Sequence, residues 1–177
     1  MKRSIGPYEG RRVRLRSLEA ADLPLTMLWR NKERCRTAFR STDPITEEDH
    51  RLWFEGYEQK EDDFVFVIES KHLPGRLSGV RIGQISLYHV TSQEAELGRM
   101  MIGDDSFLRK GCALEAVEIL VQEAGPGLGL SEIYLAVRSQ NAAAIALYQR
   151  AGFIHEGSFI CDDGAFVRMA VEMKAPR

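Results

Sequence analysis

A short basic loop at residues 108–113 is the first stretch of this chain whose residue types could do chemistry. Its residues in order are Leu108, Arg109, Lys110, Gly111, Cys112 and Ala113. The apolar residues that begin there recur at helical spacing: Ala113, Ala116, Val117, Leu120, Val121 and Ala124. At a helix start the backbone N–H groups lack intrahelical partners and the macrodipole adds positive charge. The loop is therefore a candidate anion site, although most helix starts bind only water or a capping side chain.

A second helix is predicted between Asn141 and Phe153, with Asn141 as its cap and Gly152 as its terminator. Residues 131–138 before it read as a strand, and so do residues 95–102 before the first helix. Strand, helix, strand, helix indicates two parallel strands whose carboxyl ends face one edge of a sheet. The second helix brings a polar group to that edge. Tyr148 falls three residues after an apolar position, faces inward and keeps a polar tip.

These two segments resemble the GNAT superfamily of acetyl-CoA-dependent N-acetyltransferases. The family's loop Gln/Arg-x-x-Gly-x-Gly/Ala is similar to residues 108–113, and its later motif Asn-x-x-Ser-x-x-Leu-Tyr-x-x-x-Gly-Phe is similar to residues 141–153. Leu108 replaces the first Gln or Arg and Ala144 replaces the Ser, so two side-chain contacts to coenzyme A are lost while the backbone amides remain. The resemblance covers the chain from its first strand onward. It implies acetyl-CoA as cosubstrate, without a metal, bound by Met101, Ile102, Leu108, Arg109, Lys110, Gly111, Cys112, Ala113 and Asn141.

Acetyl transfer from a thioester to an amine needs a neutral amine, a polarised carbonyl and a proton for the departing thiolate. The resemblance implies that Tyr148 supplies the proton, because the family's tyrosine lies near the thioester sulfur. A phenol with an ordinary pKa of about 10 stays protonated at pH 7. The alternative is a tyrosine that only packs on the sheet. Backbone N–H groups around Met101 and Ile102, where the family carries a bulge, would polarise the carbonyl.

Glu96 is the expected base, acting through water, because many family members carry a glutamate at this strand position. Alternation puts Glu94, Glu96 and Gly98 on one face, so either carboxylate could instead be solvated. His89, at the end of the preceding strand, is the alternative base and is counted among the substrate-binding residues.

The acceptor is suggested by a basic segment between the first two predicted helices. Its cations are Arg30, Lys32, Arg34, Arg36 and Arg40, against the single acid Glu33. This patch would repel a cationic acceptor and attract a phosphorylated amine, with Arg30 and Arg36 as the substrate-binding residues. A merely solvated patch is equally compatible with the sequence.

The runs Trp29-Arg30-Asn31 and Pro44-Ile45-Thr46 resemble the branch of the family that acetylates nucleotide-linked amino sugars. An alternative acceptor is a protein N-terminus, since the Glu-Leu-Gly strand and the Lys-Gly-x-Ala-x-Glu-Ala loop are similar to those of the ribosomal-protein acetyltransferases. The sequence is also compatible with a homodimer.

Other classes of function fit less well. A non-catalytic acyl-CoA-binding module would not need Tyr148, and an RNA-associated protein disagrees with the net charge of −2 and the lack of interleaved aromatic residues. The histidines form no ligand-spaced pair, and the 3 cysteines suggest neither a disulfide framework nor zinc. Cys112 at a helix start should have a lowered thiol pKa, but a spacer role is favoured over a nucleophile.

Composition indicates one domain over residues 1–177. A content of 44% hydrophobic and 28% charged residues is ordinary for a globular protein. No apolar run approaches a membrane span, and no hydrophobic stretch follows Lys2 and Arg3 as in a secretory signal. We therefore expect a cytoplasmic protein that binds neither nucleic acid nor membrane.

The elements that must position these groups form an α+β domain. We expect seven strands, at residues 12–16, 63–70, 80–90, 95–102, 131–138, 153–160 and 165–174. Four helices are expected, one after Asp22, one after the capping box Thr46/Asp49, and the two described above. The resemblance implies a mixed, mostly antiparallel sheet whose parallel fourth and fifth strands splay apart around the pantetheine arm.

Overall fold

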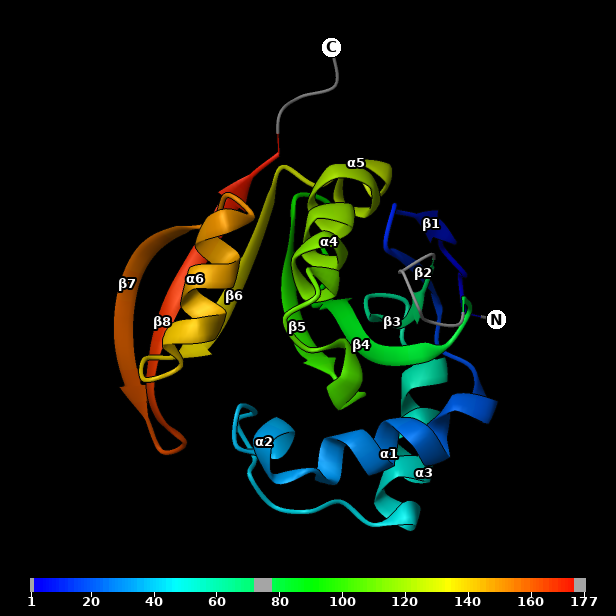
Figure 1. The fold of residues 1–177 in the computed structure, drawn as a ribbon. Helices are drawn as coiled ribbons and strands as arrows, with labels where there is room; N and C mark the ends of the chain where they lie inside the picture. Colours follow the sequence, from blue (N-terminus) through cyan, green and yellow to red (C-terminus); the bar gives the residue numbers. More distant parts are fainter. Residues whose placement is uncertain (1, 72–77, 174–177) are drawn as a thin grey trace.

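The computed structural model describes residues 2–71 and 78–173, in which eight strands form a single sheet in the order β1-β2-β3-β4-β5-β6-β8-β7. The strands are β1 (Tyr8–Glu9), β2 (Val13–Ser17), β3 (Phe64–Ser70), β4 (Arg81–Tyr88), β5 (Glu94–Ile102), β6 (Glu132–Arg138), β7 (Ile154–Cys161) and β8 (Gly164–Glu172) (Figure 1). Only β5 and β6 pair in parallel, and the other neighbours pair antiparallel. The predicted α+β class and mixed, mostly antiparallel sheet are confirmed.

The count of seven strands is wrong by one, because β1 was not predicted. β1 has 2 residues and pairs with β2. A strand of this length is too short to show an alternation of apolar and polar residues. The predicted turn between β3 and β4 falls at residues 72–77, outside the described residues, as does Lys174 at the end of the last predicted strand.

The four predicted helices are present as α1 (Leu23–Asn31), α3 (Glu47–Glu58), α4 (Cys112–Ile119) and α6 (Ala142–Arg150). Two short helices, α2 (Glu33–Arg36) and α5 (Gly125–Gly127), were not predicted, and α4 runs on into a π-helical turn at Leu120–Ala124. The capping box of α3 is confirmed, with Thr46 and Asp49 each bonding the other's backbone N–H.

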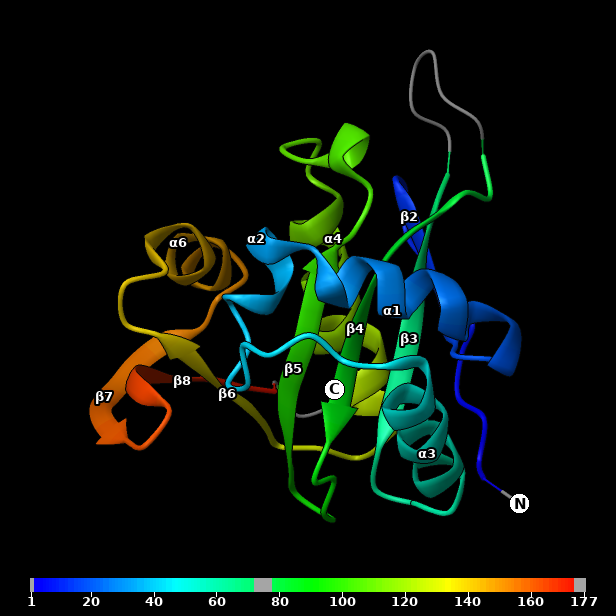
Figure 2. The same cartoon turned by 90° about the horizontal axis from the view of Figure 1, so that it is seen from below.

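The sheet is covered on both faces, and the alternating residues of β3 show how. Phe66 and Ile68 belong to the large core shared with α4, whereas Val67 packs with Phe54 and Tyr57 of α3 on the opposite face. Figure 1 shows α4 and α6 side by side on one face, and Figure 2 shows α1 lying across β4 on the other.

The parallel pair is short. Residues Glu94–Glu96 of β5 pair with Glu132–Tyr134 of β6, and both strands then continue without pairing to each other. Because β6 pairs along its whole length with β8, it is held away from β5 rather than bent back to it. The predicted splay is thus present, and Figure 1 shows the two strands diverging.

A bulge interrupts β5 just beyond the point where the strands part. Gly98 pairs with β4 and so does Met101, but Arg99 and Met100 between them have no partner in the register. Leu97 lies in the core under α4, while Met101 packs against Trp29 on the opposite face, so the bulge inverts the side-chain alternation. The bulge lies directly before Met101 and Ile102, in the stretch of strand where the resemblance implied one, and these two residues pair regularly with β4.

A part-buried carboxylate fixes the start of α4. Glu115 Oε2 accepts hydrogen bonds from the backbone N–H groups of Arg12, at 2.6 Å, and Val13, at 2.8 Å. Gly10 leaves the space for this carboxylate, because a Cβ there would lie 2.8 Å from Oε2. The first turn of α4, and with it the loop that leads into it, is therefore tied to the start of β2.

We expect Glu115→Ala to lower the free energy of unfolding by roughly 2 kcal/mol, because hydrogen bonds to a charged group are lost from a part-buried site. Urea denaturation followed by circular dichroism measures this. Glu118→Ala on the same helix is the control, since Glu118 bonds to no described residue, and it should change stability by less than about 0.5 kcal/mol. Equal losses in the two variants would contradict a specific clamp.

Candidate active site

A cleft of about 590 Å³ opens where β5 and β6 part. Its wall includes both predicted catalytic residues, Tyr148 from α6 and Glu96 from β5. The predicted coenzyme-binding residues that line it are Met101, Ile102, Leu108, Ala113 and Asn141. The structure therefore brings together at one cleft groups that are far apart in the sequence.

The loop before α4 lies next to the cleft and presents its backbone. Arg109 and Gly111 have positive φ values, 56° and 80°, and no described residue accepts a hydrogen bond from the N–H groups of residues 109–113. Successive amides of this kind at a helix start form a concave anion site. Arg12 stands beside it, because a Cβ on Gly111 would lie 3.4 Å from Arg12 Nε. The residues fit a pyrophosphate, with Arg12 as a cation that the sequence did not indicate.

Cys112 does not behave as its position predicts. Its side chain is buried, and burial raises the pKa of the thiol, with Glu115 adding to the effect. The expected lowering by the helix start is wrong, because desolvation of the thiolate is the larger influence. Cys112 is therefore a packing residue at the first turn of α4.

Tyr148 lies in α6, which is capped at its start by Asn141, whose Oδ1 accepts a hydrogen bond from the N–H of Ala144. Only 8% of Tyr148 is exposed, and its ring packs edge-on against Phe153 with centroids 5.7 Å apart. Its hydroxyl bonds to no described residue, and burial raises its pKa. The phenol is thus protonated at neutral pH and free to donate into the cleft.

Glu96 is buried and held on both carboxylate oxygens. The hydroxyl of Tyr88 donates to Oε1 at 2.8 Å, and Nδ1 of His89 lies 3.2 Å from Oε2. Burial, together with the charge of Glu96, raises the pKa of Tyr88, so this phenol remains a donor. Gly98 leaves space for the Tyr88 ring, because a Cβ on residue 98 would lie 2.6 Å from that ring.

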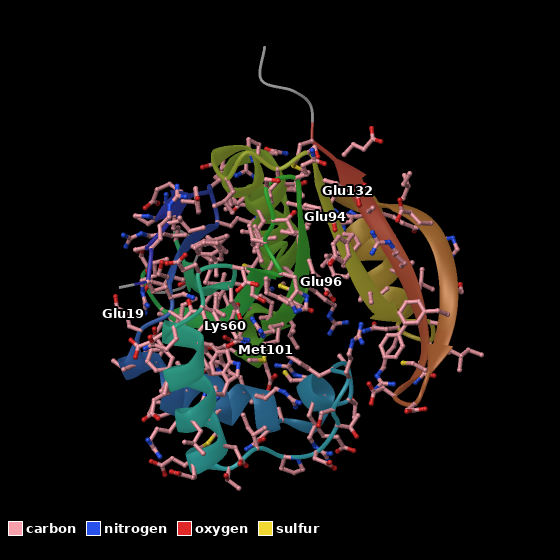
Figure 3. The ribbon with its side chains drawn as sticks, turned by 180° about the vertical axis from the view of Figure 1, so that it is seen from behind. Glu19, Lys60, Glu94, Glu96, Met101 and Glu132 are labelled. Carbon is pink, nitrogen blue, oxygen red and sulfur yellow. The ribbon has the colours of Figure 1, made fainter. Side chains whose placement is uncertain are left out.

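The carboxylate of Glu94, which was predicted on the same face of β5, lies outside the cleft. Figure 3 shows Glu94 beside Glu132 where the strands run together, and Glu96 further along. Glu94 is exposed and does not line the cleft, whereas Glu96 does. Of the two, only Glu96 is placed to take a proton from a substrate.

His89 follows β4 and takes a left-handed backbone conformation, with φ 52°. It lines neither the cleft nor the second cavity described below. The structure therefore does not bring His89 to the substrate side, although it does bring it to Glu96.

Most of the basic segment is bound to the protein itself. Arg34 donates to the carbonyl of Ile102 at 2.8 Å, Lys32 donates to that of Gly103 at 2.7 Å, and both pair with Asp105. Arg36 donates to the carbonyl of Thr42 at 2.8 Å and lines neither cavity.

Two cations of the segment keep donors available. Arg40 lines the cleft, and its guanidinium bonds to no described residue. Arg30 donates from Nη2 to the carbonyl of Ser41 at 2.6 Å, but its buried Nη1 has no partner within residues 2–71 and 78–173. The predicted patch is thus divided, and Arg40 rather than Arg36 faces the cleft.

A second cavity of about 240 Å³ adjoins the cleft and shares Arg30, Phe39 and Arg99 with it. Its other lining residues are Thr26, Ile45, Asp49, His50, Trp53 and Gln84. The bulge turns Arg99 to this side, where it forms a bidentate pair with Asp63 at 2.7 and 3.0 Å. Sequence analysis missed Arg99, Tyr88 and Trp53 as site residues, since each reads as an ordinary strand or helix position.

The described residues contain no group of three or more His, Cys, Asp or Glu side chains arranged to hold a metal ion. None of their helices has the length and apolarity needed to cross a membrane.

The family model for the acetyltransferase (GNAT) domain matches residues 12–154. The chain belongs to the acetyltransferase (GNAT) family. This assignment confirms the predicted class of enzyme, an acyltransferase with acetyl-CoA as cosubstrate. It does not distinguish the amino-sugar branch from the ribosomal-protein branch.

Solved structures of other acetyltransferases share the fold of this GNAT enzyme. Spermidine N-acetyltransferase from Vibrio cholerae, in complex with CoA and spermine, matches with a TM-score of 0.81 at 21% identity over 93% of this chain and 97% of the other. Aminoglycoside acetyltransferase AAC(6')-Ib, in complex with coenzyme A, matches with a TM-score of 0.74 at 21% identity over 90% and 94%. A comparison with curated proteins finds no match.

We expect Gly111→Val to weaken acetyl-CoA binding by about tenfold or more, because a β-branched residue at this positive φ costs on the order of 1–3 kcal/mol and distorts the amides. Calorimetry with acetyl-CoA measures the affinity. Gly129→Val is the matched control, since Gly129 also has a positive φ, 78°, but lies in the connection between α5 and β6 rather than in the loop before α4. Unchanged affinity in folded Gly111→Val would remove this loop from the coenzyme site.

Proposed function

We propose that this GNAT enzyme transfers the acetyl group of acetyl-CoA directly to a primary amine, with Tyr148 as the acid and Glu96 as the base. The observation that carries the proposal is that both side chains line one cleft from opposite faces of the sheet. Tyr148 belongs to the core on the α4 side, while Glu96 alternates with Ala95 and Leu97 of that core and so faces the α1 side.

The gap between β5 and β6 gives the two substrates separate approaches. Coenzyme A would place its pyrophosphate on the free amides of residues 109–113 and run its pantetheine arm through the gap. The acceptor would enter from the side of α1 and the basic segment. The thioester and the amine then meet beside the bulge of β5, at the only opening through the sheet that the described residues provide.

The chemistry requires three proton movements, two from the nitrogen and one to the thiolate. Glu96 takes a proton from the ammonium, directly or through water, and the neutral amine attacks the thioester carbon. Backbone N–H groups near Met101 and Ile102, directly after the bulge, would stabilise the developing oxyanion. As the carbon–sulfur bond breaks, Tyr148 gives its proton to the thiolate, and the nitrogen of the new amide loses its second proton, which restores Tyr148 directly or through water.

Tyr148→Phe should lower turnover by roughly 10²-fold to 10⁴-fold and leave acetyl-CoA binding and stability unchanged, because the lost hydroxyl bonds to no described residue. Thiol release from acetyl-CoA is followed with a panel of primary amines: a nucleotide-linked amino sugar, the free amino sugar, spermidine and a peptide N-terminus. Tyr134→Phe is the control, since Tyr134 does not line the cleft. Turnover within about threefold of the parent would make Tyr148 a packing residue.

We further propose that the acceptor is a nucleotide-linked amino sugar. The cleft lining contains the guanidinium groups of Arg30, Arg34, Arg40 and Arg99 and only one carboxylate, that of Glu96. Arg34 and Arg99 are paired with Asp105 and Asp63. The remaining guanidinium groups, those of Arg30 and Arg40, disfavour a polycation and favour an anionic amine. The adjoining cavity offers aromatic walls, Phe39 and Trp53, for a ring of the acceptor. Arg30 Nη1 in that region bonds to no described residue and is available to donate to an oxygen of the acceptor.

Arg40→Gln should raise the acceptor KM for the nucleotide-linked amino sugar about tenfold or more, because a charge-assisted hydrogen bond contributes about 1.5–3 kcal/mol. The acetyl-CoA KM should not change. Arg36→Gln is the control and should have little effect, since its guanidinium is bound to the Thr42 carbonyl and lies outside the cleft. An equal rise in KM for the free amino sugar would contradict phosphate recognition.

A further inference from the structure

The carboxylate of Glu96 has one oxygen directed at a cleft residue and the other at a residue outside the cleft. Tyr88, on Oε1, lines the cleft together with Glu96. His89, 3.2 Å from Oε2, lines neither cavity, and its side chain is 66% exposed against 12% for Glu96. Glu96 and His89 therefore span the distance from the cleft wall to solvent.

The backbone is strained where it holds this contact. A histidine at φ 52° occupies the left-handed region, which costs a non-glycine residue on the order of 1 kcal/mol or more. The imidazole stands edge-on to the Tyr88 ring at 4.7 Å and reaches back to the strand carrying Glu96. The strain is thus accompanied by a specific placement of the imidazole against the carboxylate.

The proton that the base takes from the acceptor must leave the active site before the next turnover. Each acetyl transfer leaves one proton on the base, and Glu96 is nearly buried even before substrates fill the cleft. The charged and titratable groups that face this pair are Tyr88 from β4, Arg99 and Glu94 from β5, Tyr134 from β6 and Arg40 from the basic segment. Arginine cannot accept a proton, and tyrosine is neutral at pH 7. Of the two described side chains that bond to the Glu96 carboxylate, only that of His89 has one nitrogen that accepts a proton and another that donates one.

We propose that Glu96 and His89 form a proton exit from the active site, an inference that rests on the proposed role of Glu96 as the base. Glu96 takes the proton of the acceptor ammonium, and its Oε2–H bond then breaks as the proton passes to Nδ1 of neutral His89. The imidazolium releases its Nε2 proton to water, and the neutral ring returns to its starting tautomer as Nε2 takes a proton from water and Nδ1 gives one up. One proton moves from substrate to solvent, and both residues return to their starting state.

The test uses two replacements at position 89. His89→Asn keeps a residue that tolerates a positive φ and can still bond to Glu96, but it cannot carry a proton. His89→Gly also suits this backbone and leaves space for a free imidazole. With acetyl-CoA and the panel amine that turns over fastest, we expect kcat to fall about 10²-fold in both variants while both KM values hold. Adding imidazole buffer should restore kcat in His89→Gly and leave the parent enzyme unaffected.

The outcomes separate the relay from the base. If His89→Asn matches the parent in dilute buffer while Glu96→Gln is inactive, the relay is wrong and the base assignment stands. If Glu96→Gln keeps full turnover, the base assignment fails and the relay falls with it. A loss in His89→Gly that imidazole does not restore would mark His89 as a structural partner of Glu96 and overturn the relay.

Discussion

The structure depends on where backbone pairing between β5 and β6 stops. Three residue pairs join the strands, after which β6 is held by β8 and β5 by β4. The strand groups that face each other beyond Glu96 and Tyr134 are left without strand partners, and such groups must bond to water or to a ligand. A break in hydrogen bonding thus creates both an opening through the sheet and a row of backbone donors and acceptors suited to an amide-containing arm.

The bulge in β5 determines what each side of that opening presents. Because Gly98 and Arg99 both face the α1 side, the strand turns a guanidinium toward the acceptor region that regular alternation would have turned toward the core. The bidentate pair with buried Asp63 then keeps this charge compensated. Charge near the acceptor is set by backbone irregularity as much as by residue type.

The sequence contained enough to predict the architecture and part of the site. Apolar spacing and turn residues located seven strands and four helices, and the family motifs placed Tyr148 and Glu96, which the fold brings to one cleft. The bonding partners of the arginine side chains in the basic segment could not be predicted, because they depend on loops that come together only in three dimensions. Arg36 and Arg40 have the same chemistry in sequence, yet one bonds a carbonyl and the other faces the cleft. The raised pKa of the Cys112 thiol could not be predicted either, since burial of the thiol depends on packing against the sheet.

Lys32 and Arg34 join the proposed acceptor side of the cleft to the proposed coenzyme loop. These side chains grip the carbonyls of Ile102 and Gly103 and the carboxylate of Asp105, in the connection that leads directly to the coenzyme loop. The same segment carries Arg30 and Arg40 on the acceptor side. A change in this connection on coenzyme binding would alter the affinity for the acceptor, and thermodynamic linkage makes such an effect equal in both directions. The proposed coenzyme and acceptor sites are thus connected through a few hydrogen bonds between the basic segment and the end of β5.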